Sequence, residues 1–289
     1  MNKSIIQWYP GHIAKAEKQL KSQLDKVDLI FEVLDARIPL ATSHPHLKKW
    51  TKGKKHLLII NRLDMIPSEA QISWDKWFRL KGNTPWWCNA KTGTGVKQIQ
   101  EAAIRAGAEL NLRRKTRGMK SRAIRALTIG FPNVGKSALI NRLVKKKIVS
   151  SSRRAGVTRS LQWVRLGQEL DLLDAPGVLP PKLDNQLSAL KLAICDDIGA
   201  ASYDVESVAV SFLQLITQLT EREGSGICTK LIEDRYGIAY PTLESEQYEW
   251  LLSASHRHTS GNTTRMAQRL LDDFRKSFLG SLSLELPND

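Results

Sequence analysis

The chain has 289 residues, 42% of them apolar, which is enough to build one large domain or two ordinary ones. Its 44 lysine and arginine residues against 29 acidic residues give a net charge of +15, which indicates a polyanionic partner such as nucleic acid or an anionic membrane. No apolar run approaches the ~18 residues of a membrane span, we expect no signal peptide, and three scattered cysteines argue for a reducing compartment and against a disulfide framework or zinc site.

The first part of the chain alternates helices with apolar strands. Apolar residues recur at helical spacing over 13–27, and strands are predicted over 28–35, 55–60 and 84–88. A helix is predicted around Trp74, and a second helix should follow over residues 96–110. Continuously apolar strands between helices are typical of a parallel sheet covered on both faces, so we expect an α/β doubly wound, mostly parallel sheet.

The pattern changes along the second part of the chain. Residues 111–125 and 145–159 are basic and contain no acidic residue, and we interpret the first stretch as a linker. A hairpin is predicted over 161–174. After Pro180-Pro181 only helices are expected, over 185–195, 205–219 and 263–279. We therefore predict two domains, an α/β domain over residues 1–182 and a smaller all-α domain over 183–289.

Residues 130–137, GFPNVGKS, match the pattern of a phosphate-binding loop, G-x-x-x-x-G-K-[ST]. A predicted strand over 123–129 precedes the loop and a helix follows it, so backbone N–H groups and the helix dipole point at one spot. Lys136 can reach the β- and γ-phosphates of a nucleotide, and the Ser137 hydroxyl can hold Mg²⁺. We predict that the nucleotide contacts of this loop are Asn133, Val134, Gly135, Lys136, Ser137 and Ala138.

A second motif, Asp174-Ala175-Pro176-Gly177, follows the predicted hairpin. An aspartate there can bind Mg²⁺ through water, and the Gly177 N–H can contact a γ-phosphate. Without the phosphate loop, a simple turn would explain this tetrapeptide. Thr158 lies between the two motifs and can add a hydroxyl ligand to Mg²⁺, although a surface threonine explains it equally well.

Asn61-Arg62-Leu63-Asp64 resembles the N-K-x-D motif that recognises guanine. Asp64 can accept hydrogen bonds from the guanine N1–H and N2–H₂ groups, which adenine lacks, while Asn61 helps to fix the base and the loop. Arg62 keeps the charge of the usual lysine but not its shape, which leaves its effect on guanine affinity open. Asn89-Ala90-Lys91 matches the S-A-K position, where a backbone N–H meets guanine O6. Both motifs follow predicted strands, where α/β sheets bind ligands.

These motifs occur in an unusual order. The guanine motifs at 61–64 and 89–91 precede the phosphate loop, whereas an ordinary GTPase begins with that loop. A circular permutation restores the usual arrangement, because the termini of a compact domain often lie close together. Residues 108–122 would form the join. The loops that sense the γ-phosphate would then lead directly into the helical domain.

Together with these motifs, residues 8–12 (WYPGH), 33–39 (VLDARIP) and 280–285 (GSLSLE) resemble the circularly permuted GTPases of the YlqF type over nearly the whole chain. The resemblance implies a cytoplasmic GTP hydrolase that acts in late maturation of the large (50S) ribosomal subunit. It implies GTP, GDP, the large subunit and its rRNA as partners, Mg²⁺ as cofactor, and a C-terminal domain similar to an RNA-binding module. We expect a monomer away from the ribosome.

The resemblance also bears on catalysis. Val178 follows Gly177 at the position where many GTPases have a water-orienting glutamine, and valine cannot orient water. The family implies that His12 substitutes for that glutamine; the alternative is a histidine that only packs in its Pro-Gly turn. Asn133 matches a position that helps to bind K⁺ in potassium-stimulated GTPases. We expect Lys136 and Mg²⁺ to provide most of the charge stabilisation.

Two hypotheses about function follow. The first is a GTP hydrolase whose slow basal rate rises on rRNA, with the basic segments contacting phosphates. The second is a GTP-controlled RNA-binding placeholder in which hydrolysis is incidental. A peripheral membrane GTPase is disfavoured, because the basic stretches lack the interleaved large apolar residues of an interfacial helix.

Overall fold

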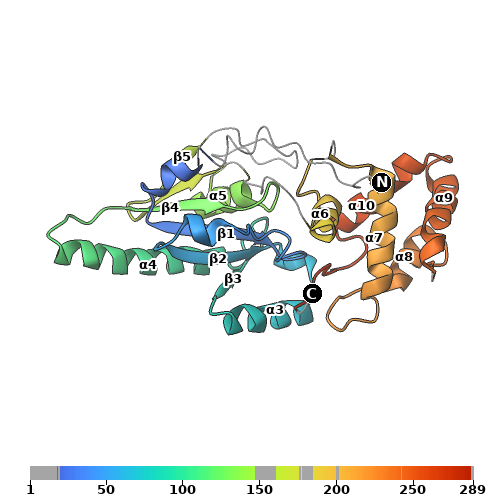
Figure 1. Cartoon of the computed structure of the whole chain (residues 1–289), viewed down its shortest axis with the longest axis horizontal. Helices are drawn as coiled ribbons and strands as arrows, with labels where there is room; N and C mark the ends of the chain where they lie inside the picture. Colours follow the sequence, from blue (N-terminus) through green and yellow to red (C-terminus); the bar gives the residue numbers. More distant parts are fainter. Residues whose placement is uncertain are drawn as a thin grey trace.

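A computed structural model of the chain describes residues 18, 20–146, 161–175, 177, 185–199, 202–241 and 243–287. One six-stranded sheet, in the order β3-β2-β1-β4-β6-β5, forms the centre of the larger part (Figure 1). All neighbouring strands are parallel except β5 and β6, which form the predicted hairpin. The strands are β1 (Leu29–Asp35), β2 (Lys55–Asn61), β3 (Pro85–Trp87), β4 (Ile124–Ile129), β5 (Gln162–Leu166) and β6 (Leu170–Asp174).

Helices cover both faces of this sheet. On one face, α4 (Val96–Thr116) and α5 (Lys136–Val144) bury their apolar sides against alternate residues of β1, such as Phe31. On the other face, α3 (Ser68–Leu80) packs Trp74 and Phe78 in one cluster with Leu34 of β1 and with Leu58 and Ile60 of β2. The helical residues 20–24 lie on this second face as well. The predicted α/β doubly wound fold is therefore confirmed, and it follows from the two-residue repeat of a strand buried on both sides.

Two helix ends differ from the sequence predictions. α4 continues to Thr116, so the first part of the basic stretch 111–125 is helix and the linker prediction was wrong there. Lysine and arginine are good helix formers and are favourable near the negative end of the helix dipole. Conversely, α10 (Thr263–Arg275) ends before the predicted Leu279, because Ser277 adopts a left-handed backbone with φ 60°.

The C-terminal part is helical, as predicted, but richer in helices than the sequence patterns indicated. α6 (Gln186–Ile194), α7 (Val205–Leu219) and the start of α10 match predictions, whereas α8 (Thr229–Tyr236) and α9 (Gln247–His258) were not predicted. In the N-terminal part, the short α2 (Leu47–Trp50) was not predicted either. Asn185, Asp204 and Asn262 cap their helices by accepting a backbone N–H three residues on. The rings of Phe212 and Phe274 pack 5.0 Å apart between α7 and α10.

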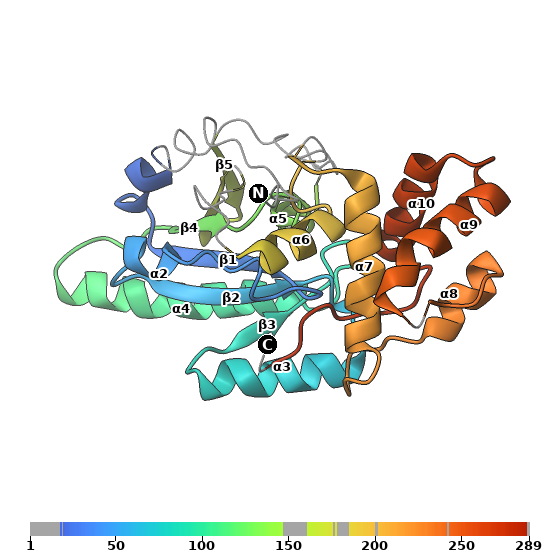
Figure 2. The same ribbon diagram turned by 45° about the vertical axis from the view of Figure 1, so that its right-hand side comes forward.

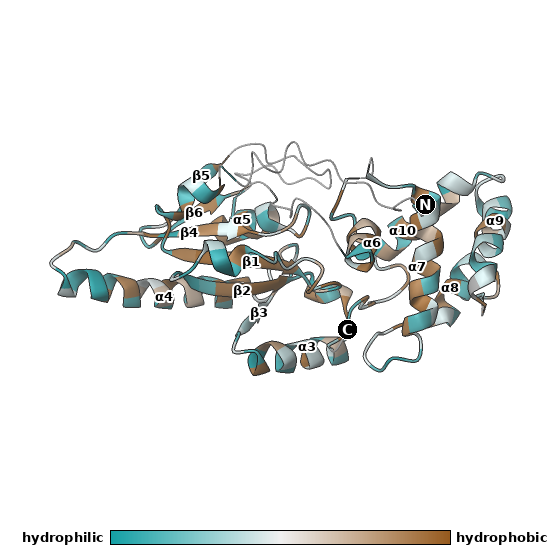
Figure 3. Cartoon of the chain, in the orientation of Figure 1, coloured by the Kyte–Doolittle hydropathy of each residue, from teal (hydrophilic) through white to brown (hydrophobic). Residues whose placement is uncertain are grey.

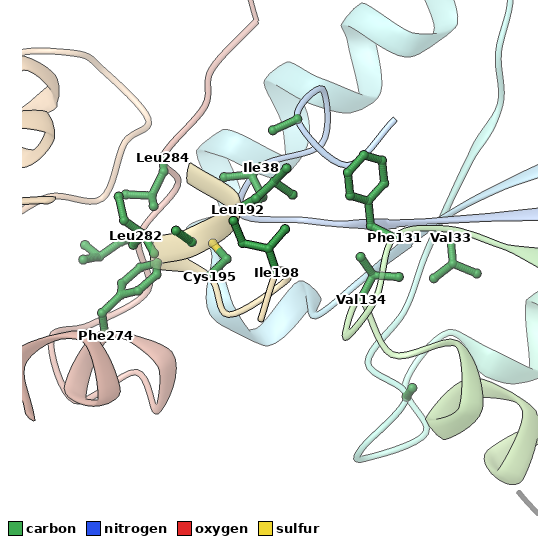
Figure 4. Packing of buried hydrophobic residues seen from close by; sticks show 14 of the residues in the cluster. Val33, Ile38, Phe131, Val134, Leu192, Cys195, Ile198, Phe274, Leu282 and Leu284 are labelled. Carbon is green, nitrogen blue, oxygen red and sulfur yellow. The ribbon is translucent and has the colours of Figure 1, made fainter. Parts of the chain in front are cut away.

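The helical part and the sheet share a continuous core. Figure 4 shows Ile38, from the segment after β1, beside Leu192 and Leu284, while Phe131, Val134 and Val33 form a second group. All of them belong to one cluster of buried apolar residues. The C-terminal segment runs back from the helices toward α3 (Figure 2). There the Leu284 N–H donates to the Arg37 carbonyl at 3.0 Å, and the Trp74 indole N–H donates to the Glu285 carbonyl at 3.1 Å. The division into domains 1–182 and 183–289 stays a prediction.

The hydropathy of the residues changes along the molecule. The strands are the most apolar region, while the end of α4, which projects beyond the sheet at the left of Figure 3, is hydrophilic. Among the described residues, no helix combines the length and apolar character needed to cross a membrane.

Candidate nucleotide-binding site

The predicted motifs converge at one edge of the sheet. The parallel strands β1, β2, β3, β4 and β6 all end there, so the loops that follow them are neighbours. The guanine motif at 61–64 follows β2, the phosphate loop follows β4, and Asp174 ends β6. Segments that are far apart in the chain, and in permuted order, therefore lie side by side.

Asn61 ties three of these segments together. Its side-chain Nδ2 donates to the Val134 carbonyl of the phosphate loop at 2.8 Å. Its Oδ1 accepts the backbone N–H of Ala90 at 3.0 Å. The buried Asn61 amide thus uses both ends to hold the phosphate loop and the 89–91 loop at fixed positions.

The contacts of Arg62 explain why arginine stands here in place of the usual lysine. With φ 68°, its backbone turns the side chain toward the phosphate loop, where a guanidinium nitrogen donates to the Asn133 carbonyl at 2.6 Å. Its Nε lies 3.2 Å from the buried Asp35 carboxylate. A planar guanidinium serves both acceptors at once, which a single ammonium group would do less well.

The loop 89–91 is held by hydrogen bonds from one of its own side chains and from a side chain of α5. The Asn89 side chain accepts the backbone N–H groups of Lys91 at 2.9 Å and Thr92 at 3.1 Å, so asparagine here closes the turn. Arg142 of α5 donates to the carbonyls of Ala90 and Lys91. These contacts hold the loop backbone next to the 61–64 turn, where Leu63 N–H donates to the Cys88 carbonyl at 3.1 Å.

The phosphate loop needs its glycines for space. Gly135 has φ 101°, and a Cβ there would lie 2.2 Å from Asn61 Nδ2. Asn133 also adopts a left-handed backbone, with φ 58°, so successive N–H groups form the kind of concave backbone that binds anions. A Cβ at Gly177 would meet the Pro132 backbone nitrogen at 2.6 Å, which shows how closely the 174–177 motif approaches the loop.

Lys136 is buried within this loop. Its Nζ donates to the carbonyls of Gly130 at 3.1 Å and Phe131 at 2.7 Å. Burial lowers the pKa of Lys136 to about 8, while the nearby carboxyl groups of Asp174 and Asp197 act in the opposite direction. The ammonium therefore still carries most of its charge at neutral pH and stands at the N-terminus of α5, where anions bind.

Ser137 and Asp174 form a donor set that suits Mg²⁺. The Ser137 hydroxyl donates to Asp174 Oδ2 at 3.1 Å. The other oxygen, Oδ1, is buried and finds no hydrogen-bond donor among the residues that the structure describes. Burial raises the pKa of Asp174, and Lys136 partly offsets that rise. Hard oxygen donors at the strand end, next to the phosphate loop, fit the ion.

Among the remaining predicted site residues, the structure describes Asp64 and Ala138 but not two others. Asp64 is exposed in the short helical turn Leu63–Met65, and its backbone carbonyl accepts the Ser281 hydroxyl at 3.3 Å. Ala138 is half-buried in the first turn of α5. His12 and Thr158 lie outside the described residues.

Sequence reasoning missed a buried charge cluster beneath the site. Arg37 makes a two-pronged contact with Asp35, at 3.0 Å from Nε and 2.7 Å from the terminal nitrogen. Burial by itself would raise the pKa of Asp35, but the guanidinium groups of Arg37 and Arg62 lower it below its usual value. The signal available in the sequence was Asp35 at the carboxyl end of an apolar strand, the same position that Asn61 and Asp174 occupy in theirs.

Residues of this charge cluster and of the phosphate loop also contact the C-terminal helical part. Arg37 donates to the Cys195 carbonyl at 3.1 Å, and the Asn133 side chain donates to the Asp196 carbonyl at 2.6 Å. Asp197 is fully buried, and neither of its carboxylate oxygens finds a donor within the described part of the chain. Burial and the neighbouring Asp35 raise the pKa of Asp197 to about 8. The phosphate loop therefore contacts the segment that ends α6.

The fold and this constellation define a P-loop nucleotide-binding protein with GTPase motifs in permuted order. A family model described as 50S ribosome-binding GTPase matches residues 125–222. Ribosome biogenesis GTPase A of Bacillus licheniformis is 35% identical over 286 residues, covering 99% of each chain. The Bacillus cereus protein of that name is 39% identical over 212 residues, covering 73% of this chain and 72% of its own.

Solved structures agree on the fold. A GDP-bound YlqF structure superimposes with a TM-score of 0.62 at 22% identity, covering 94% of this chain and 100% of that one. GNP-bound YlqF from T. maritima superimposes with a TM-score of 0.60 at 23% identity, covering 95% and 99%. The chain belongs to the ribosome biogenesis GTPase A family, and it is a GTP-hydrolysing enzyme.

Proposed function

We propose that the converging loops bind GTP with the roles predicted from the sequence. Asp64 and the 89–91 loop, with Asn89 and Ala90, recognise guanine. Asn61, Arg62 and Leu63 shape that subsite, and residues 133–138 with Gly177 surround the phosphates. The support is geometric: Asn61 bonds to the phosphate loop and to the 89–91 loop at 2.8 and 3.0 Å. Adenine would leave the Asp64 carboxylate without its two donors, so the site should prefer GTP over ATP.

The chain's own residues can account for most of the chemistry in this proposal. Ser137, Asp174 and Thr158 would hold Mg²⁺, which when bound supplies positive charge beside the β- and γ-phosphate oxygens. Lys136 contributes a second positive charge at the helix N-terminus. His12 orients or deprotonates the attacking water, because Val178 cannot. Asn133, which lies in the phosphate loop, is the candidate K⁺ ligand.

At the level of biology, we propose that this GTPase acts in late maturation of the large (50S) ribosomal subunit in the cytoplasm. It would bind rRNA as a monomer and use its nucleotide state to control association and release. The observation that carries this proposal is similarity along the full length of a protein named ribosome biogenesis GTPase A. The net charge of +15 and the exposed basic residues of 111–125 are consistent with contact to rRNA phosphates.

A direct test measures hydrolysis of GTP and of ATP with and without purified large subunits. We expect GTP to be hydrolysed, ATP not, and the rate with GTP to rise when subunits are added. Replacing K⁺ by Na⁺ in the same assay tests the role given to Asn133. Equal use of ATP would contradict the base-recognition argument, and no response to subunits would contradict the ribosomal one.

The alternative, a GTP-controlled RNA-binding placeholder in which hydrolysis is incidental, makes a different prediction for His12→Ala. If hydrolysis drives release, this variant should bind GTP and large subunits but stay on them. If turnover is incidental, it should release normally after GTP is removed. His56→Ala, at a half-buried histidine on β2 that belongs to none of the motifs, is a control for loss of a histidine elsewhere.

A further inference from the structure

The sheet ends, at the edge opposite β3, in a strand that exposes a tryptophan. Trp163 of β5 is 42% exposed, although its register partner Leu173 is buried. Arg125 of β4 and Arg165 of β5 both align with Asp171 of β6, so both arginines share the sheet face of Trp163. An aromatic ring and two exposed guanidinium groups therefore meet at one end of this face.

The contact between ring and arginine is loose. The Arg125 guanidinium carbon lies 5.7 Å from the centroid of the Trp163 ring, near the ~6 Å limit of a cation–π contact. The side chain of Arg165 is 82% exposed and its Nε lies 3.6 Å from Asp171, an ion pair that water weakens. Neither arginine is locked in place, so all three side chains can rearrange around a ligand.

The chain leading to Arg125 adds positive charge. Arg114 and Arg122 are held by the Asp28 carboxylate. Lys115, Arg117 and Lys120 are exposed and form no ion pair with any residue that the structure describes. We call the stretch 111–125 the basic end. Its positive charge is complementary to a phosphate backbone, while the ring of Trp163 is complementary to the face of a base.

We infer that Trp163 and Arg125 form a stacking platform for an unpaired RNA base, with the basic end of 111–125 contacting the flanking phosphates. An unpaired segment fits better than a duplex, because the base faces of a duplex are covered by their neighbours in the stack. This inference rests on the proposed ribosomal function for the choice of RNA. The platform lies on β5 and β4, outside the loops assigned to the nucleotide.

The test uses the full-length protein and a fluorescently labelled, unstructured oligouridine, with affinity measured by anisotropy at several salt concentrations. Trp163→Ala should weaken binding about tenfold, the loss expected when one base loses its aromatic partner. Trp163→Phe should keep most of the affinity because it keeps a ring. Affinity for an RNA duplex of equal length should be the same for Trp163→Ala and the unaltered protein.

Leu80→Ala is the matched control, since Leu80 is a 77% exposed apolar residue on α3, beside the opposite edge of the sheet. Equal oligouridine affinity for Trp163→Ala and Leu80→Ala would overturn the inference. Failure of the unaltered protein to bind oligouridine would overturn it as well. The proposed ribosomal function is judged separately, by whether large subunits stimulate GTP hydrolysis, so the two can fail independently.

Discussion

The two ends of the sheet differ in how their positively charged side chains are placed: buried and paired at one end, exposed at the other. At the carboxyl end of the strands, Arg37 is fully buried, and its guanidinium donates hydrogen bonds to Asp35 and to the Cys195 carbonyl. At the other end, Arg117 and Lys120 are exposed, without an ion pair among the described residues. Burial and available partners, not residue type, thus decide whether a positive charge supports the fold or meets a ligand.

The largest effect should come from the one buried cation at the carboxyl end that we assign to the nucleotide. Lys136→Ala removes an ammonium group that stands beside the phosphates, and loss of such a group costs roughly 10²- to 10³-fold in hydrolysis. Single-turnover GTP hydrolysis measures the change. Lys120→Ala, at the basic end, should keep the rate of hydrolysis. A similar loss of rate in both variants would contradict the assignment of Lys136, and not Lys120, to the nucleotide.

An effect of similar size is expected on the free energy of unfolding, and only for an arginine at the carboxyl end of the sheet. Arg37→Met leaves the buried Asp35 carboxylate with Arg62 as its remaining cation, and removing one partner of such a pair costs about 3–5 kcal/mol. Urea unfolding measures the free energy. Arg117→Met should leave the midpoint unchanged, because an exposed side chain outside any ion pair contributes little. Unchanged stability of Arg37→Met would show that the buried cluster is not structural.

The pH dependence sharpens the comparison further. Burial raises the pKa of Asp197 to about 8, above the ~3.9 of an unfolded chain, so between these values the folded state holds a proton that the unfolded state has lost. Its contribution to the free energy of unfolding therefore falls as pH rises through this window and levels off above pH 8.

Asp197→Asn removes that titration. The variant should gain stability relative to the unaltered protein as pH rises from 5 to 8, as measured by urea unfolding at each pH. Asp234→Asn, on an exposed position of α8, should follow the profile of the unaltered protein. A constant difference across this range would mean that Asp197 is already ionised at pH 5.

The smallest effect is expected at the basic end. Arg117→Met should weaken binding of an RNA duplex a few-fold and reduce the slope of log affinity against log salt by about 0.9, the change for one lost phosphate contact on a double helix. Titrations at several salt concentrations measure the slope. The Arg79→Met variant, whose arginine pairs with Asp75 on α3, should keep the original slope.

Local patterns predicted the elements that carry the site. The apolar run before Asp35, the hairpin pattern that ends at Asp174 and the glycines around Lys136 each placed a strand or a turn correctly, because burial and close backbone approach restrict residue choice locally. Helix ends were less predictable. The last turns of α4 and the early stop of α10 at Arg275 depend on small propensities that nearby residues can reverse.

The sequence by itself determined the fold class, the phosphate loop and the permuted order of the motifs, since each depends on residues that are neighbours in the chain. Tertiary structure alone decided what Arg62 does, because its acceptors are Asp35 at the end of β1 and Asn133 in the loop after β4. It also decided that the Asn133 side chain meets Asp196 at the end of α6. Contacts between distant segments depend on how strands are ordered in the sheet, and that order is a property of the whole packed chain.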